Sequence, residues 1–218
     1  MVNNIKAFWR YSATGLGVLF GFVVFCLVST ALFGPESLFA NYLRGGIMMF
    51  FIISPILSSS LVRSLVNIGL AMGAVRKSLW STMELAIAVQ ALVCLPMQAL
   101  LDWGASVFTP EETGLSLTLP ARGLSGLALF LLLWAMGAMG SWLSLVQKTS
   151  WRIFGWGLVI VLYLGYMAAM VAHIIFSFFG MDTILWVICG VSLAVGGVAS
   201  LGLYRQCRTA QVKGADTQ

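Results

Sequence analysis

The sequence predicts an all-α integral membrane protein with six transmembrane helices, and three observations lead to this fold class. Of its 218 residues, 60% are hydrophobic and only 9% are charged, whereas soluble domains carry roughly 25% charged residues. Six separate apolar runs approach the roughly 20 residues that a spanning helix needs. Basic residues gather in alternate connections between these runs, as they do in cytoplasmic segments. We therefore expect a multi-pass protein of the cell membrane, with a bacterial plasma membrane as its location.

The six predicted spans form a single membrane domain over residues 1–204. They are assigned from apolar runs bounded by charged or turn-forming residues, at 13–33, 45–62, 83–101, 124–146, 153–176 and 183–204. The first run is longer than the roughly 7–15 apolar residues of a signal peptide, so we expect it to be a retained helix. Residues 205–218 are basic and polar, which predicts a disordered cytoplasmic tail.

The connections carry their own signals. Pro55 lies inside the second span and removes one backbone donor, which predicts a kink there. The longest outer connection, 102–122, contains Thr109, Pro110, Glu111 and Glu112. A threonine cap, a proline in the first turn and a glutamate three residues after the cap are typical of a helix start. We predict a short helix there, lying at the outer surface.

The distribution of charge sets the predicted orientation, because cytoplasmic connections carry an excess of lysine and arginine. An even number of spans places both termini on one side, and we predict that this side is the cytoplasm. Only Arg44 and Arg122 then lie outside. The other ten basic residues lie inside: Lys6, Arg10, Arg63, Arg76, Lys77, Lys148, Arg152, Arg205, Arg208 and Lys213.

Small residues at four-residue spacing mark faces where membrane helices approach closely. Such pairs or series occur in the first, fourth and sixth spans: Gly17 and Gly21; Gly137 and Ser141; Ser192, Gly196 and Ser200. The favoured interpretation is packing within one bundle. The alternative for Gly17 and Gly21 is a dimer face.

Two ionisable residues lie inside predicted spans, where such groups are functional hypotheses by default. Glu84 follows Ser81 by three residues, and this spacing predicts a capping box at the start of the third span rather than catalysis. His173 has no acidic partner on its own helix turn, so we favour a structural role over proton transfer or ligand contact. The sequence has one histidine and no Cys-x-x-Cys pair, and we expect no metal site.

The most informative connection is 63–80, between the second and third spans. Arg63 lies at one end and Arg76 and Lys77 near the other, and its middle, with Gly69 and Gly73, is uncharged. A loop that only rests on anionic lipid would spread its basic residues along one face. We predict a short helix at about 64–75 that fits a protein groove.

The stretch 69–80, GLAMGAVRKSLW, resembles the first cytoplasmic loop of type-2 ABC exporter permeases. In that family a glycine, two residues, a basic pair and then an aromatic residue form a coupling helix that docks on a separate ATPase. The resemblance implies that Gly73, Arg76 and Lys77, with Gly69 beside them, dock an ABC ATPase subunit. It also implies pairing with a second permease chain, identical or different.

By this resemblance the chain is a transport subunit and not itself an enzyme. It has no Gly-x-x-x-x-Gly-Lys-Ser/Thr phosphate loop, so we expect ATP and Mg²⁺ on the partner ATPase and no cofactor on this chain. Neither the composition nor the charge pattern indicates nucleic acid. Two other classes remain open: the substrate-binding membrane component of an energised uptake system, and a non-transporting membrane scaffold or immunity protein. The transported substrate is not indicated by the sequence.

Overall fold

The computed structural model describes residues 2–34, 36, 38–44, 46–71, 76–108, 123–146, 149–176 and 181–209. Within these ranges the chain is helical and has no strand, which confirms the predicted all-α class. The helices are α1 (Val2–Phe33), α2 (Leu38–Arg44), α3 (Gly46–Ala71), α4 (Arg76–Phe108), α5 (Gly123–Leu145), α6 (Thr149–Phe176) and α7 (Met181–Thr209).

Five of these helices are long and apolar enough to cross a membrane, as predicted for a multi-pass protein. The qualifying segments are Ala13–Phe33, Ser78–Phe108, Gly123–Leu145, Thr149–Ala168 and Asp182–Thr209. Within the described part of α3, the apolar segment is shorter and runs over Ile52–Arg63. The structure therefore supports five of the six predicted spans. The remaining one, predicted at 45–62 and lying in α3, stays a prediction.

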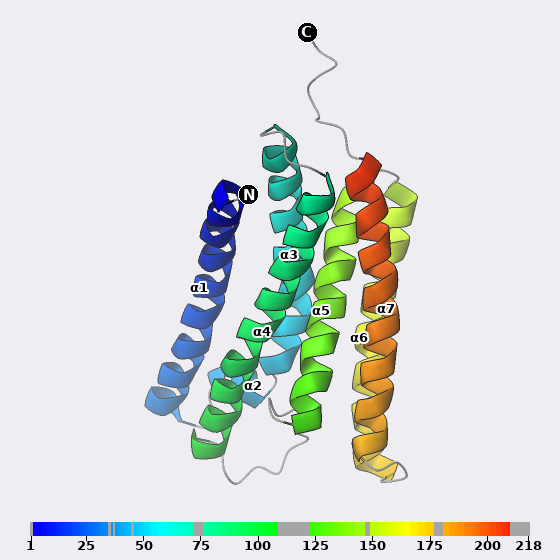
Figure 1. Cartoon of the computed structure of the whole chain (residues 1–218). Coiled ribbons are helices and arrows are strands. Elements are labelled where there is room, and N and C mark those ends of the chain that lie inside the picture. Colours follow the sequence, from blue (N-terminus) through cyan, green and yellow to red (C-terminus); the bar gives the residue numbers. More distant parts are fainter. Residues whose placement is uncertain are drawn as a thin grey trace.

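α5 lies at the centre of the bundle and contacts α3, α4, α6 and α7. α1 and α2 pack on α4 at one side, while α6 and α7 lie at the other (Figure 1). The start of α1, the end of α7 and the facing ends of α3 and α4 lie at the same end of the bundle, which we call the terminal end (Figure 1). The predicted topology, with six spans and both termini in the cytoplasm, stays a prediction.

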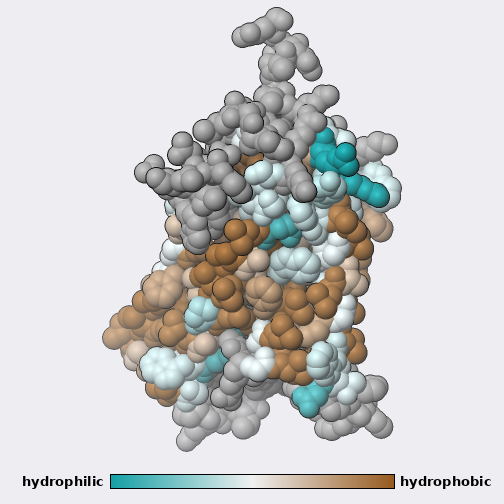
Figure 2. Space-filling view, viewed as in Figure 1, coloured by the Kyte–Doolittle hydropathy of each residue, from teal (hydrophilic) through white to brown (hydrophobic). Residues whose placement is uncertain are grey.

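Apart from Glu84 near the start of α4 and Arg44 at the end of α2, the charges of the described residues separate along the bundle. Arg63, Arg152, Arg205 and Arg208 belong to the terminal ends of α3, α6 and α7, whereas Glu36, Asp102 and Asp182 lie toward the opposite end. Figure 2 shows a broad apolar band across the described surface, with a strongly hydrophilic patch near the terminal end. This is the pattern that an apolar membrane core between two aqueous phases requires.

The packing of α5 depends on its small residues, as the Gly137 and Ser141 spacing predicted. A Cβ added at Gly140 would lie 2.7 Å from Pro55 Cα and closer still to the Pro55 carbonyl oxygen. A Cβ at Gly137 would lie 2.7 Å from Ile87, and Ser141 is fully buried. The backbones of α3 and α5 therefore approach closely where Pro55 interrupts the helical hydrogen bonds of α3.

Polar side chains join α3, α4 and α5 beside this contact. Ser58 Oγ donates to Gln90 Oε1 at 3.1 Å, Gln90 Nε2 donates to the Ser54 carbonyl at 3.4 Å, and Ser54 Oγ donates to the Leu133 carbonyl at 3.4 Å. Ser54, Ser58 and Gln90 are all buried. Hydrogen bonds of this kind hold membrane helices together, because a buried polar group without a partner is costly in an apolar medium.

α7 is longer than its predicted span and continues to Thr209. The first residues of the predicted tail, Arg205 to Thr209, are therefore helical rather than disordered, and residues 210–218 lie outside the described part. Cys207, predicted in the tail, is fully buried. The helix continues because its inner face, with Leu203 and Cys207, packs on α4 residues such as Met83.

Candidate functional site

The stretch 63–80 does not form a helix of its own in the described residues, which corrects the predicted coupling helix at 64–75. Residues 63–71 continue α3 and residues 76–80 begin α4; we call these two segments the hairpin end. The helix runs on past Arg63 because Leu65 and Val66 are buried against neighbouring helices. Arg63 itself is exposed, and its Nε donates to the Ser144 carbonyl at 3.2 Å, so its charge does not interrupt α3.

The predicted docking residues fall on both sides of this hairpin end. Gly69 lies in the last turns of α3 and is buried, and Arg76 and Lys77 are the first two residues of α4. Gly73 lies outside the described residues. The side chains of Arg76 and Lys77 are also outside the described part, so their contacts stay a prediction.

The hairpin end is built into a hydrophobic core of its own, which we call the hairpin core. It joins α3, α4 and α7 through buried residues: Val62, Leu65, Val66, Leu79, Met83, Ala86, Ile87, Leu203 and Cys207. Trp80 also reaches α7, where its ring meets Tyr204 edge to face at 5.4 Å. The α3 and α4 ends are therefore packed on α7 and do not project as a free loop.

Glu84 lies inside α4 and is not part of a capping box, so this prediction is wrong. α4 begins at Arg76, and Ser81 Oγ donates to the Ser78 carbonyl at 3.0 Å instead of capping. Glu84 Oε2 accepts a hydrogen bond from Trp134 Nε1 of α5 at 3.3 Å. Its Oε1 is buried without a partner. Glu84 thus places a carboxylate between α4 and α5, at the border of the hairpin core. Only one of its two oxygens is hydrogen-bonded.

We expect Glu84→Gln to unfold with nearly wild-type stability, because the amide oxygen can still accept from Trp134. Glu84→Leu should lose about 1–2 kcal/mol, since it leaves the indole N–H of Trp134 unpaired. Detergent titration of the purified variants, followed by circular dichroism, compares the two. Equal losses for both variants would show that the carboxylate charge, and not the hydrogen bond, stabilises the bundle.

The remaining predicted residues have different outcomes. A Cβ added at Gly17 or Gly21 would meet nothing within 4 Å, so these glycines do not pack within the bundle as favoured; Gly15 makes the close approach instead, against Leu57. The dimer face at Gly17 and Gly21 stays a prediction. His173 lies in α6, but its side chain and the predicted helix at 109–112 are outside the described residues.

In the sixth predicted span, at 183–204, small residues lie at helix contacts, as the sequence predicted. A Cβ at Gly196 would lie 2.7 Å from a ring carbon of Trp134, and Ser192 is buried. A Cβ added at Gly202, about one turn and a half further on, would lie 2.6 Å from the indole of Trp142. Glycines in α7 therefore make room for two tryptophans of α5.

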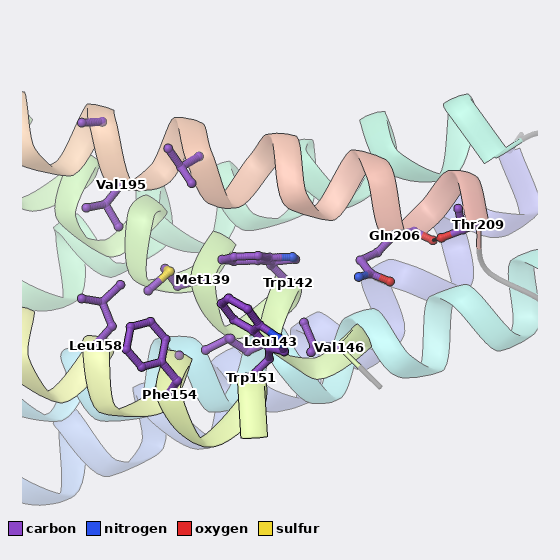
Figure 3. A pocket seen from close by; sticks show the side chains of 13 residues that line it. Met139, Trp142, Leu143, Val146, Trp151, Phe154, Leu158, Val195, Gln206 and Thr209 are labelled. Atoms are coloured by element: carbon purple, nitrogen blue, oxygen red, sulfur yellow. Dashed lines mark hydrogen bonds between the residues drawn. The ribbon is translucent and has the colours of Figure 1, made fainter. Parts of the chain in front are cut away.

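Sequence reasoning missed an apolar cavity of about 860 Å³ between α5, α6 and α7. Figure 3 shows Val195 and Leu158 toward one end of the cavity and Gln206 and Thr209 toward the other. Its walls are mostly aromatic and aliphatic: Met139, Trp142, Leu143, Val146, Trp151, Phe154, Gly155, Leu158, Ala194, Val195, Val198, Gln206 and Thr209. The volume is that of a site for a small organic molecule, roughly 300–1,000 Å³.

A second cavity of about 340 Å³ continues along the same three helices. Val195 borders both cavities, and Tyr166 and Ser192 border only the second. Both exist because α6 packs on α5 but only weakly on α7. The periodicity of a uniformly apolar helix does not show how closely it packs on each neighbour, so no signal in the sequence located the cavities.

Four cysteines are free and buried, and the described residues contain no group of three side chains suited to hold a metal.

Comparison with protein-family models, curated proteins and solved structures finds no match to this chain.

Proposed function

We propose that this chain is the transmembrane subunit of an ATP-driven ABC exporter and that its hairpin end docks on a separate ATPase. The observation that carries the proposal is the position of the hairpin end. It lies at the terminal end of the bundle, where Arg63, Arg152, Arg205 and Arg208 gather, and it shares a buried core with α7. An element that receives motion from a partner must be joined to the helices that it moves.

The packing suggests how docking would reach the interior. Displacement of the hairpin end moves the buried Leu203 and Cys207 of α7, because they belong to the same core. Trp134 and Trp142 of α5 pack against that core, and Trp142 together with Gln206 also lines the larger cavity. Closure of the ATPase would therefore widen or narrow the cavity by moving its α5 and α7 walls.

The proposed assembly contains two permease chains and two ATPase subunits, with ATP and Mg²⁺ held by the ATPases. Gly17 and Gly21 face away from the described bundle and are available to a second permease chain. The cavity walls are mainly apolar, which favours a hydrophobic substrate.

The two alternatives have less support. A substrate-binding uptake component requires a ligand pocket near the outer face, under the connection 102–122, whereas the larger cavity reaches Gln206 and Thr209 at the terminal end of α7. A scaffold or immunity protein requires a surface for its partner. This class gives no reason for a cavity whose walls are joined to that surface.

A pull-down of the tagged protein in mild detergent tests the proposal. We expect an ATP-binding subunit to be recovered with the wild type, and the double variant Arg76→Glu, Lys77→Glu to lose at least tenfold of it, because reversed charges oppose an acidic groove. The matched control is Arg205→Glu, Arg208→Glu, which reverses two charges at the same end of the bundle. Full transport-coupled ATP hydrolysis in the Arg76/Lys77 variant would disprove the docking role, and recovery of this chain alone would favour the scaffold class.

A further inference from the structure

The cavity between α5, α6 and α7 opens sideways toward the bilayer. Three of its lining residues are strongly exposed: Trp151 at 61%, Phe154 at 65% and Val198 at 63%. All three belong to segments that are apolar enough to span the membrane. A molecule dissolved in the lipid can therefore enter the cavity without crossing water.

The described residues that line this cavity carry no charge. Arg152 follows the lining residue Trp151 on α6 but does not line the cavity itself, and its Nη2 donates to the Val146 carbonyl at 3.0 Å. Arg208 lies over the ring of Tyr204, 5.7 Å from its centre, and neither of these residues lines the cavity. An ion in an apolar site without a partner of opposite charge loses its hydration and gains no compensating contact. The cavity therefore selects uncharged molecules.

Aromatic rings form much of the cavity wall. Trp142 contributes from α5, and Trp151 and Phe154 contribute from α6 (Figure 3), where the last two rings meet edge to face at 6.1 Å. A Cβ added at Gly202 would lie 2.6 Å from the Trp142 indole, so this ring is packed against α7. Aromatic side chains stack on other flat ring systems and contact them edge to face. The wall therefore favours a flat aromatic ligand.

One end of the cavity offers hydrogen bonds. Gln206 and Thr209 lie at that end (Figure 3). Thr209 Oγ1 lies 3.2 Å from the backbone carbonyls of Arg205 and Gln206 and donates its hydrogen to them, so toward a ligand this hydroxyl is an acceptor. Gln206 is partly buried, and its side-chain amide can both donate and accept. A ligand with one N–H or carbonyl group can be paired here.

We propose that the cavity binds one uncharged molecule from the bilayer, with a flat aromatic body among Trp142, Trp151 and Phe154 and a hydrogen-bonding group at Gln206. The volume of about 860 Å³ accommodates such a body, and the second cavity, which shares Val195, leaves room for an apolar extension. This site deepens the proposed function, on which it rests only for naming the molecule as the class of transported substrate. Binding itself requires no ATPase, so it is measured on this chain alone.

Fluorescence titration of the full chain in phosphatidylcholine nanodiscs, without ATPase, tests the site. The probe is N-phenyl-1-naphthylamine, an uncharged aromatic amine whose N–H can donate, and empty nanodiscs give the fluorescence of probe that is dissolved in lipid. We expect saturable binding of one probe per chain. The second probe, 1-anilinonaphthalene-8-sulfonate, has the same ring system with a sulfonate added. Its dissociation constant should be at least tenfold larger, because its charge would be unpaired in the cavity.

Two pairs of variants locate the bound probe. Ala194→Phe places a ring in the cavity from α7 and should weaken saturable binding at least fivefold, whereas Leu193→Phe, next to it but outside the lining, should not. Gln206→Leu should weaken binding about fivefold, the effect of one neutral hydrogen bond. Its control is Arg205→Leu, which is exposed on the same turn of α7 and lies outside the lining.

Four results would each overturn the site: no saturable binding in the wild type, equal affinity for the two probes, unchanged binding in Ala194→Phe or Gln206→Leu, or equal losses in a variant and its control. Size-exclusion chromatography confirms that each variant is folded and monodisperse. Saturable binding by a chain that recovers no ATPase in the pull-down would contradict the exporter function and leave the site standing. Recovery of the ATPase without probe binding would do the reverse.

Discussion

Gly140→Leu is expected to destabilise the bundle by about 3 kcal/mol or more, the upper range for overpacking a core. The substitution is destabilising because the atoms nearest to Gly140 are backbone atoms. An added Cβ would lie 2.7 Å from Pro55 Cα and 2.8 Å from the Pro55 carbonyl carbon. A side chain can rotate away from such a clash, but α3 and α5 would have to separate. Separation would also lengthen the Ser54 hydrogen bond to Leu133, already 3.4 Å.

Gly190→Leu in α7 is the matched control, because a Cβ at Gly190 meets nothing within 4 Å. The measurement is the fraction of folded protein during titration with a denaturing detergent, together with the yield of monodisperse protein. We expect Gly190→Leu to unfold at the wild-type detergent fraction and Gly140→Leu to unfold well before it. If both variants unfolded like the wild type, the close contact between α3 and α5 would not exist in the membrane.

The sequence predicted the helical class well, because this class depends on local composition. Long apolar runs require helices in a membrane, since every backbone group must find its partner internally. The start of α1, the end of α7 and the described parts of the 63–80 stretch lie at one end of the bundle, whereas the six-span topology with cytoplasmic termini stays a prediction. Small residues such as Gly137 and Gly196 were also predicted correctly to lie at helix contacts.

The incorrect predictions concern features that tertiary packing decides. Arg63 ended an apolar run in the sequence, but the helix continues because Leu65 and Val66 are buried behind it. The capping box failed for the same reason: residues 76–80 already belong to α4, so Ser81 has no helix start to cap. The cavity depends on the weak contact between α6 and α7, and this packing follows from three helices together rather than from any one of them.

Met83→Ala should cost about 3 kcal/mol and should also separate ATPase docking from transport. Met83 is fully buried in the hairpin core, and its Sδ lies 3.9 Å from the Cys207 thiol of α7. Truncation of a buried methionine to alanine leaves a cavity and typically lowers the free energy of unfolding by about 2–5 kcal/mol. The lost contact is one that joins α4 to α7, so it weakens the link through which the hairpin end would move the cavity wall.

Leu85→Ala provides the control on the same helix. Leu85 is 63% exposed on the outer face of α4, so its truncation should change the free energy of unfolding by less than about 0.5 kcal/mol. The decisive measurement compares the two variants, at a temperature where both are folded, for recovery of the ATPase and for ATP hydrolysis stimulated by transport. We expect Met83→Ala to keep the ATPase and lose stimulation, because its docking surface is intact while its hairpin core is loosened. Full stimulation in a destabilised Met83→Ala would contradict a route through α7 and would direct attention to the hydrogen bonds of Gln90, which join α4 to α3 independently.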